Sequence, residues 1–383
     1  MSATEDTILD AVGRVLARRG IHDTTIDAIA AEAGMTKGGV LYYFANKQEL
    51  LQGIIEKVDR RIRDECDKIH AAMPARRRCM VRAAVLALFK HFDRTSNDAN
   101  IGLGFMGDPV CRGTIGSLRK LKYSTLAKAA ASRDGVATVL LILDGIWMNM
   151  LFESKAFASN LHDDAVSVLL GLADACCHDP AAFALPKRRT RTTVATVTAA
   201  PREDDSCNAI LDAAERVLSQ HGLANTTFDA VAREAGMSKG GVLHYFRNKR
   251  DMLSAIVYRF EKQFSERRTE IAASLPDAPD RFVRATFAAV AESRRQLNAS
   301  VPYRLDMLED EHYRTIISDV RKRMYTDLLK GSRRPEKVLV ALYMMDGLWM
   351  HQFFSPQAIP AGNLAHARKW LDGYIEKLYE DYS

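Results

Sequence analysis

The stretch Gly34–Leu51, GMTKGGVLYYFANKQELL, returns later in the chain at Gly236–Leu253 as GMSKGGVLHYFRNKRDML. In each copy a glycine precedes a Thr or Ser that can cap a helix, and apolar residues then recur four positions apart. Val40 and Phe44 are this apolar pair in the first copy. The pattern predicts a short helix after a tight turn, the second helix of a helix-turn-helix, in both halves of the chain.

Residues on either side of the first copy extend the helical pattern. Apolar residues recur with helical spacing between Ile8 and Leu16, Thr25 can cap a second helix, and Lys47 begins a longer helix that continues to about His70. Further helical stretches follow, and none of them has the alternation of a strand. The sequence therefore predicts a small helical head joined to a larger helical body.

The same pattern restarts at a constant distance of 202 positions. Gly34 matches Gly236 in the heads, and Asp144 matches Asp346 in the bodies. A fixed offset over heads and bodies indicates duplication of the whole unit. Between the copies, residues 179–205 carry prolines, a basic cluster and a Thr/Ala/Val tract, which is typical of a linker.

The doubled stretch resembles the signature of the TetR family of transcription regulators, in which this short helix lies in the DNA major groove. The resemblance covers nearly the whole chain outside the linker. It implies an all-α fold of two TetR-like units, each with an N-terminal three-helix helix-turn-helix head and a helical ligand-binding and dimerisation body. The predicted boundaries are 1–50 for the first head, 51–179 for the first body, 180–205 for the linker, 206–252 for the second head and 253–383 for the second body.

Composition excludes little but agrees with this reading. The net charge of +6 suits an anionic partner without proving one. The six cysteines have no metal-ligand spacing, the ten histidines are scattered, and neither a signal peptide nor a membrane-length apolar run is evident. We therefore expect a cytoplasmic protein that is not an enzyme and has no cofactor and no bound metal.

The short helix of the first head has an outward side that we expect to face DNA. Turning 100° per residue from Val40 places Gly38, Leu41, Tyr42 and Ala45 on that side. Tyr42 could donate to a base edge and Leu41 could pack on a thymine methyl group, whereas two glycines let the backbone approach closely. Thr36 and the lysines suit phosphate, and the family resemblance adds Thr24, Thr25, Tyr43 and Lys47 as backbone contacts.

An alternative is that Leu41 and Tyr43 only complete the core of the head. The chain also departs from many family members, which carry Tyr where this sequence has Leu41 and Leu243. The predicted DNA-binding residues are Thr24, Thr25, Thr36, Lys37, Gly38, Gly39, Leu41, Tyr42, Tyr43 and Lys47 in the first head, and Thr226, Thr227, Ser238, Lys239, Gly240, Gly241, Leu243, His244, Tyr245, Arg247 and Lys249 in the second.

The two heads are not equivalent. Three positions gain an arginine in the second head, which should therefore bind phosphate more strongly. The two half-sites should be alike at the base pairs that shared residues read and should differ at those that changed residues read. The expected operator is therefore an imperfect palindrome. The changed pairs are Tyr42 and His244, Ala45 and Arg247, Ala31 and Arg233, and Gln48 and Arg250.

Members of the resembled family work as homodimers, because one short helix reads too few base pairs. Here a single chain already holds two heads, which leaves two possibilities open. The bodies could pair within the chain as a pseudo-dimer, with 136–152 and 161–177 joining 338–354 and 364–379 in a four-helix interface. Alternatively, two chains could form a homodimer with four heads.

The resemblance also implies a small apolar or amphipathic effector that binds the bodies and releases DNA. Each candidate lining residue could instead be ordinary core, and the two aspartates could bond either a neighbouring helix or the ligand. A small-molecule-binding protein without DNA recognition, or a redox sensor built on Cys176 and Cys177, remain alternatives. The candidates are Phe89, Phe92, Phe105, Met106, Asp144 and Trp147 in the first body, and Phe287, Tyr303, Met307, Asp346 and Trp349 in the second.

Overall fold

The computed structural model of the chain describes residues 2–21, 23–94, 105, 108–152, 159–185, 205–277, 281–296, 307, 310–330 and 332–380. Within these ranges the chain forms α-helices and short 3-10 helices without a strand, so the predicted all-α fold is confirmed. It divides into two compact units, one of Met1–Pro186 with Glu336–Lys377 and one of Lys187–Pro335 with Leu378–Ser383. The last two helices of the second repeat therefore pack in the first unit.

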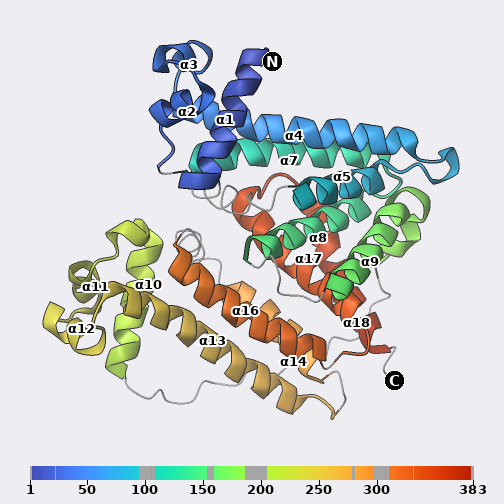
Figure 1. Cartoon of the computed structure of the whole chain (residues 1–383). Coiled ribbons are helices and arrows are strands. Elements are labelled where there is room, and N and C mark those ends of the chain that lie inside the picture. The colour runs from blue at the N-terminus through green and yellow to red at the C-terminus, as the bar shows by residue number, and fades with distance from the viewer. Residues whose placement is uncertain are drawn as a thin grey trace. The chain divides into compact units, whose positions relative to one another are not determined.

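The first head consists of α1 (Ala3–Arg19), α2 (Ile26–Ala33), α3 (Lys37–Tyr43) and the start of α4 (Lys47–Ala72) (Figure 1). Side-chain oxygens of Thr25, Thr36 and Asn46 accept backbone N–H groups at the starts of α2, α3 and α4. These caps satisfy donors that a helix start leaves unpaired, and each is worth about 1 kcal/mol. Local chemistry thus defines where each short helix begins.

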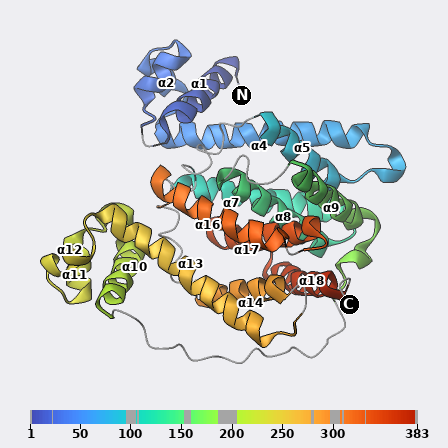
Figure 2. The same ribbon diagram turned by 60° about the horizontal axis from the view of Figure 1, so that its bottom comes forward.

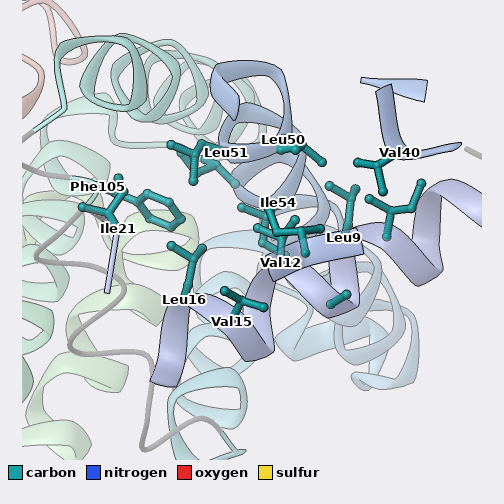
Figure 3. Close-up of a cluster of buried hydrophobic side chains, with 14 of the residues drawn as sticks. Leu9, Val12, Val15, Leu16, Ile21, Val40, Leu50, Leu51, Ile54 and Phe105 are labelled. Atoms are coloured by element: carbon teal, nitrogen blue, oxygen red, sulfur yellow. The ribbon is translucent and has the colours of Figure 1, made fainter. Parts of the chain in front are cut away.

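One apolar cluster holds the first head together (Figure 3). Leu9 and Val12 of α1 are completely buried against Val40 of α3 and Leu50 of α4. Burying four such side chains contributes roughly 1.5–3 kcal/mol each, which far exceeds the intrinsic stability of helices this short. The head is therefore a product of packing, and α3 is held by a single fully buried residue.

The first body continues through η1 (Ala75–Arg77), α5 (Met80–Arg94), α7 (Pro109–Ala129), α8 (Arg133–Phe152), α9 (Ser159–His178) and η2 (Pro180–Phe183). Helix α7 runs beside α4 and then contacts α8 (Figures 1 and 2). Helices α5 and α8 both pack on α9. The first residues of the predicted linker form η2, whose Phe183 is buried.

Helices α17 (Pro335–Phe354) and α18 (Ala361–Glu380) complete the first unit. A Cβ atom on Gly145 of α8 would lie 1.7 Å from the carbonyl oxygen of Tyr343. A Cβ atom on Gly347 of α17 would lie 1.6 Å from the carbonyl oxygen of Leu141. Since no side chain fits at these distances, the two glycines allow the helix backbones to touch.

The second unit contains α10 (Asp205–Asn225), α11 (Phe228–Ala235), α12 (Lys239–Tyr245), α13 (Lys249–Ser274), α14 (Arg281–Gln296) and α16 (Glu311–Lys330). Its head has its own cluster around Ile210, Val242 and Leu253, all completely buried. A separate cluster around Ile271 and Ala285 joins α13 to α14. The second head therefore has an independent core.

The offset of 202 positions holds in three dimensions. Both ends of α11, α12, α13, α17 and α18 lie 202 residues after the ends of α2, α3, α4, α8 and α9. The duplication thus extends to the bounds of individual helices. Among the residues that the structure describes, none of the helices is long and apolar enough to cross a membrane.

Candidate nucleic-acid interface

The turn before α3 is set by a glycine in each head. Gly34 ends α2 with φ 67° and ψ 30°, and Gly236 ends α11 with φ 67° and ψ 26°. This left-handed conformation costs other L-residues roughly 1–2 kcal/mol, which explains the residue type at both positions. The N–H of Gly34 bonds to carbonyls of α2, so the direction of α3 follows directly from the end of α2.

The residues predicted to point outward from α3 are exposed. Tyr42 is 83% exposed and Leu41 is 36% exposed, and Gly38 and Ala45 are exposed as well. Tyr43 is half-buried, packs against the head core and meets the Tyr42 ring edge-on at 5.1 Å. Leu41 is thus available to a partner, whereas Tyr43 contributes part of its ring to the core.

The second head presents an equivalent surface. Leu243 is 42% exposed and Tyr245 is 37% exposed. His244 is exposed and its ring meets that of Tyr245 edge-on at 5.4 Å. Arg247 is exposed beside them. The imidazole therefore replaces a phenol at the most outward position of the helix.

The lysines of the first head are engaged within it. The Nζ of Lys37 lies 2.9 Å from Asp27 Oδ2 in an exposed ion pair. The Nζ of Lys47 donates to the Ile21 carbonyl at 2.5 Å. A DNA phosphate would compete with Asp27 for Lys37, and exposed ion pairs are weak enough for such competition.

The second head repeats these contacts. Lys239 pairs with Asp229 at 2.8 Å, and Lys249 donates to the Leu223 carbonyl. Burial lowers the pKa of Lys249. The framework that holds the basic side chains is therefore the same in both heads.

Thr24 and Thr226 correct part of the prediction. Both are completely buried. Their hydroxyls donate to the carbonyls of Gly20 and Gly222, four residues earlier, at 2.6 and 2.9 Å. Neither side chain can reach DNA while it closes the turn between the first two helices of its head. The neighbouring Thr25 is exposed, as is its equivalent in the second head.

The surfaces of the two heads differ in charge. Residues 5–49 carry five basic and seven acidic side chains, a formal net charge of −2, whereas residues 207–251 carry six basic and five acidic, a net charge of +1. The second head gains Arg233, Arg247 and Arg250, all exposed, but has no arginine at the equivalents of Arg18 and Arg19, so the fall in acidic side chains supplies most of the difference in net charge. The second head is therefore the more attractive to a polyanion.

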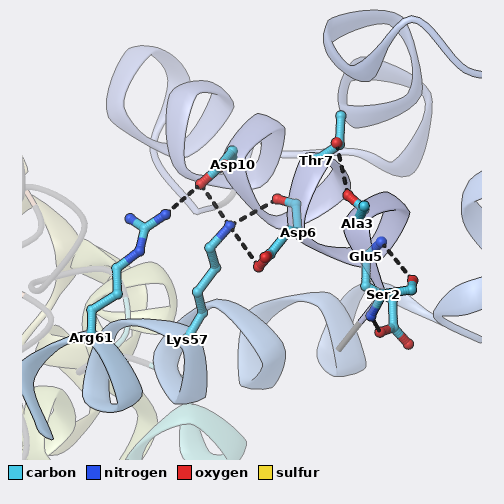
Figure 4. Close-up of polar contacts among 8 residues, drawn as sticks. All are labelled: Ser2, Ala3, Glu5, Asp6, Thr7, Asp10, Lys57 and Arg61. Atoms are coloured by element: carbon cyan, nitrogen blue, oxygen red, sulfur yellow. Dashed lines mark hydrogen bonds and ion pairs between the residues drawn. The ribbon is translucent and has the colours of Figure 1, made fainter. Parts of the chain in front are cut away.

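A buried cation joins the first head to its body (Figure 4). Lys57 of α4 is 4% exposed, and its Nζ donates to the carbonyl of Asp6 and to Asp10 Oδ1, both at 2.8 Å. Burial would raise the pKa of Asp10, but Lys57 and Arg61 hold it below its usual value. Arg259 makes the equivalent contacts to Asn208 and Asp212 in the second head and also pairs with Glu215.

Two candidate effector residues belong to the heads instead. Phe105 is 8% exposed and packs in the cluster of the first head (Figure 3), and Met307 is 1% exposed and packs in that of the second. They are equivalent positions, 202 residues apart. Each lies in the segment before the next body helix, so they connect body to head, and their role as ligand-lining residues stays a prediction.

The other effector candidates lie in several places. Phe89, Trp147 and Trp349 are half-buried and Phe287 is buried. Met106, Tyr303 and the side chain of Phe92 lie outside the described residues. Their role as ligand-lining residues stays a prediction.

Asp144 and Asp346 bond to neighbouring helices. Asp144 accepts two hydrogen bonds from the guanidinium of Arg119 on α7, and Asp346 accepts one from Asn149 on α8 at 2.9 Å. Burial raises the pKa of Asp144 although Arg119 opposes the shift, and burial also lowers the pKa of Lys122 nearby. The sequence does not identify these partners, because they come from helices whose order along the chain does not reveal their packing.

A buried histidine lies close to this group. His351 of α17 is 1% exposed, and neither ring nitrogen has a hydrogen-bond partner among the described residues. Burial, reinforced by the charges of Arg119 and Arg368, lowers its pKa to about 4. The backbone of Pro356 opposes the shift. His351 is therefore neutral near pH 7.

The adjacent residues Cys176 and Cys177 are in different states. Cys177 forms a disulfide with Cys79, which links the end of α9 to the residue before α5. Cys176 stays a buried thiol whose pKa burial raises to about 12. The partner of Cys177 lies 98 residues away, so no local spacing pointed to it.

Comparison with known proteins agrees with this architecture. The model of bacterial regulatory proteins of the tetR family matches residues 8–54 and again 210–256, and that of the tetracyclin repressor-like C-terminal domain matches 280–376. The transcriptional regulator BetI of Burkholderia thailandensis is 27% identical over 43% of this chain and 91% of its own length. The regulator AcrR of Shigella flexneri is 33% identical over 22% of this chain and 39% of its own length.

Two solved structures are also similar. The multidrug binding protein EbrR, complexed with malachite green, has 20% identity over 45% of this chain and 98% of its own, with a TM-score of 0.36. A transcriptional regulator from Rhodococcus sp. Rha1 has 21% identity over 46% and 97%, with a TM-score of 0.35. Relatives of this kind are regulators and not enzymes. The chain therefore belongs to the TetR family of bacterial transcriptional regulators and is a DNA-binding protein that carries the helix-turn-helix domain of the family twice.

Proposed function

We propose that this regulator works as a single-chain pseudo-dimer in the cytoplasm, with both heads on one operator and a small effector that releases them. One observation carries the proposal. Gly145 approaches the carbonyl of Tyr343, and Gly347 approaches the carbonyl of Leu141. Since 347 and 343 are the equivalents of 145 and 141, the two contacts are reciprocal, as they are across a two-fold axis.

The unequal heads favour an operator with unequal half-sites. Both heads keep the cap, the glycines and the lysine that position the short helix, so similar base steps suit both. Tyr42 and His244 differ in the groups that they offer to base edges. The extra arginines of the second head favour tighter phosphate contact on its side.

The contacts between heads and bodies support control by an effector. Phe105 and Met307 place body segments inside the head cores, and Lys57 and Arg259 tie each first helix to a long body helix. A ligand that prefers one arrangement of a body would bias the position of its head. The effector class remains the small apolar or amphipathic molecule, and repression is the proposed mode.

The test combines mass and stoichiometry. Light scattering of the intact chain should give about 42.7 kDa, and titration of selected DNA should saturate at one chain per operator with protection of two half-sites. Half-sites are expected roughly one helical turn apart, about 34–36 Å. A particle of twice that mass, or protection of one half-site, would overturn the single-chain proposal.

The disulfide favours a second candidate function, a response of the first body to thiol oxidation. Cys79 and Cys177 close a loop across α5, α7, α8 and α9, so reduction would release the constraint between two body helices. DNA affinity should change when a dithiol reductant is added and should be insensitive to it in Cys79→Ser. Cys176→Ser, next to the bridge, is the matched control and should respond like the parent. Equal affinity of oxidised and reduced parent protein would exclude this function.

A further inference from the structure

The two-fold relation between α8 and α17 sets an expectation for every other contact of this interface. In a true homodimer each contact occurs twice, because both faces are identical. Here the faces come from different repeats, and among the described residues the glycine contacts are repeated. The polar contacts between α8–α9 with η2 on one side and α17–α18 on the other can therefore be compared with the residues at their mirror positions.

The first one-sided contact joins a histidine to a tyrosine. His162 Nδ1 lies 3.1 Å from the hydroxyl of Tyr343. Burial lowers the pKa of His162, and its ring shares one hydrogen bond with the hydroxyl. The mirror positions, 202 residues away, hold Leu364 and Leu141. One side thus has a matched polar pair and the other has a matched apolar pair.

The second one-sided contact centres on Asp134 at the start of α8. Its carboxylate accepts a hydrogen bond from Asn363 at 2.8 Å and lies 3.4 Å from His366 Nδ1. The mirror of this aspartate is Glu336. The mirrors of its two partners are Leu161 and Asp164, neither of which can donate to a carboxylate.

The third contact involves the 3-10 helix η2. Trp370 Nε1 donates to the Ala182 carbonyl at 3.0 Å, and His366 Nε2 donates to the Phe183 carbonyl at 2.7 Å. The Phe183 ring is buried where a Cβ on Gly135 would clash at 2.5 Å. The mirror of Trp370 is Val168, which has no donor, and the mirror of Gly135 is Lys337, which would fill this space.

We propose that these one-sided contacts make the interface selective, so that the first body binds the second body and rejects a second copy of itself. In a pair of first bodies, His162 would face Leu141, and Asp134 would face Leu161 and Asp164. In a pair of second bodies, Tyr343 would face Leu364. Each like pair leaves buried or half-buried polar groups without these partners, whereas the mixed pair satisfies them, and specificity is this difference.

This inference rests on the proposed pairing of the two bodies within one chain. It adds the contacts that favour this mixed pair over a pair of identical bodies. The intact chain alone does not test selectivity, because the linker already raises the effective concentration of the mixed pair. We would insert a protease site within residues 187–204 of the full chain, cut the folded protein, and mix labelled with unlabelled cut chains. Native mass spectrometry after complete label exchange then counts mixed and like pairs of halves.

Cut wild-type protein should show mixed pairs in excess over random pairing by at least about tenfold. Two opposite variants make the faces alike. His162→Leu with Tyr343→Leu removes the polar pair, and Leu141→Tyr with Leu364→His adds a second one. Both should reduce the excess by at least about threefold, although one loses and the other gains a hydrogen bond. A change in stability alone would not move both in the same direction.

Random pairing of the cut wild-type halves would overturn the proposal. Unchanged selectivity in both variants would show that the His162 and Tyr343 pair does not contribute to the selectivity of the interface. Light scattering of the uncut chain separates this test from that of the proposed function. A mass of twice 42.7 kDa would end the single-chain pseudo-dimer, yet the cut halves would still report which bodies prefer each other.

Discussion

The two heads share a framework and differ on the surface that it presents. Thr25 and Thr227 cap equivalent helices, Gly34 and Gly236 have the same φ of 67°, and both lysines of one head repeat their contacts in the other. By contrast, the exposed positions change from neutral side chains to arginines. Framework and reading surface therefore vary independently, because exposed side chains contribute little to the packing that holds the short helix.

The two bodies differ in another way. The bounds of α17 and α18 match those of α8 and α9 and their glycines make reciprocal contacts, but among the described residues the polar contacts between them do not repeat. Asn149 bonds to Asp346, whereas the ring nitrogens of its buried equivalent His351 have no hydrogen-bond partner among the described residues. Shape is thus symmetric where backbones touch, and chemistry is asymmetric where side chains meet.

The largest effect is expected from Gly145→Val and Gly347→Val. A side chain at either position meets a carbonyl oxygen within 1.7 Å, so the helices must separate, at a cost of roughly 3 kcal/mol or more. Urea unfolding should give similar losses for both variants, since the contacts are reciprocal. Gly171→Ala, which has open space around it, is the control and should not lose stability. A large loss for one variant only would contradict the two-fold relation.

The next effect is a pH dependence carried by His351. The unfolded chain takes up a proton near pH 6.5, whereas the folded chain does so only near pH 4, because burial lowers the pKa to about 4. Stability is therefore complete above pH 6.5 and falls as the pH drops towards 4, by up to about 3 kcal/mol.

The test replaces His351 by asparagine, the residue at the equivalent position 149 of the first repeat. His351→Asn should flatten the loss of stability between pH 6.5 and pH 4, measured as the urea midpoint at each pH. Asn149→Gln, which does not titrate either before or after substitution, is the matched control. Parallel pH curves for parent and His351→Asn would show that other groups carry the dependence.

A smaller effect should follow from making the second head resemble the first. Arg233→Ala, Arg247→Ala and Arg250→Gln together should weaken binding to random-sequence duplex DNA about tenfold or more at low salt. The slope of log K against log salt should fall by up to about 2–3, since each phosphate contact contributes about 0.9. The reverse set, Ala31→Arg, Ala45→Arg and Gln48→Arg, should strengthen binding. Unchanged salt dependence of binding in both sets would show that these residues do not contact DNA phosphates.

The smallest effect concerns base preference. Exchanging the outermost residues, by Tyr42→His with His244→Tyr, should swap the preferences of the two half-sites at one base step by about 1 kcal/mol, or roughly fivefold. Selection from random DNA measures this swap. Thr25→Ser, which keeps the cap and touches no base position, should leave the selected sequence unchanged. Identical selected operators for parent and exchanged protein would place neither residue at a base edge.

Much of the fold followed from local patterns. Caps, glycine turns and helical spacing act over three or four residues, so they predicted the short helix and the outward position of Tyr42. The burial of Thr24 and Phe105 in the first head did not follow from these local patterns, because each depends on contacts made after the helices pack. The same is true of Cys177, whose partner comes from another helix end.

The sequence by itself determined that this protein is a duplicated helical regulator with two unequal heads, because a constant offset and short-range helix chemistry are written in the order of residues. Only the tertiary structure decided that α17 and α18 of the second repeat pack with α8 and α9 of the first. It also decided which polar groups meet there. The physical reason is that such contacts arise from surfaces brought together over about 200 residues of chain, where no local spacing can encode the partner.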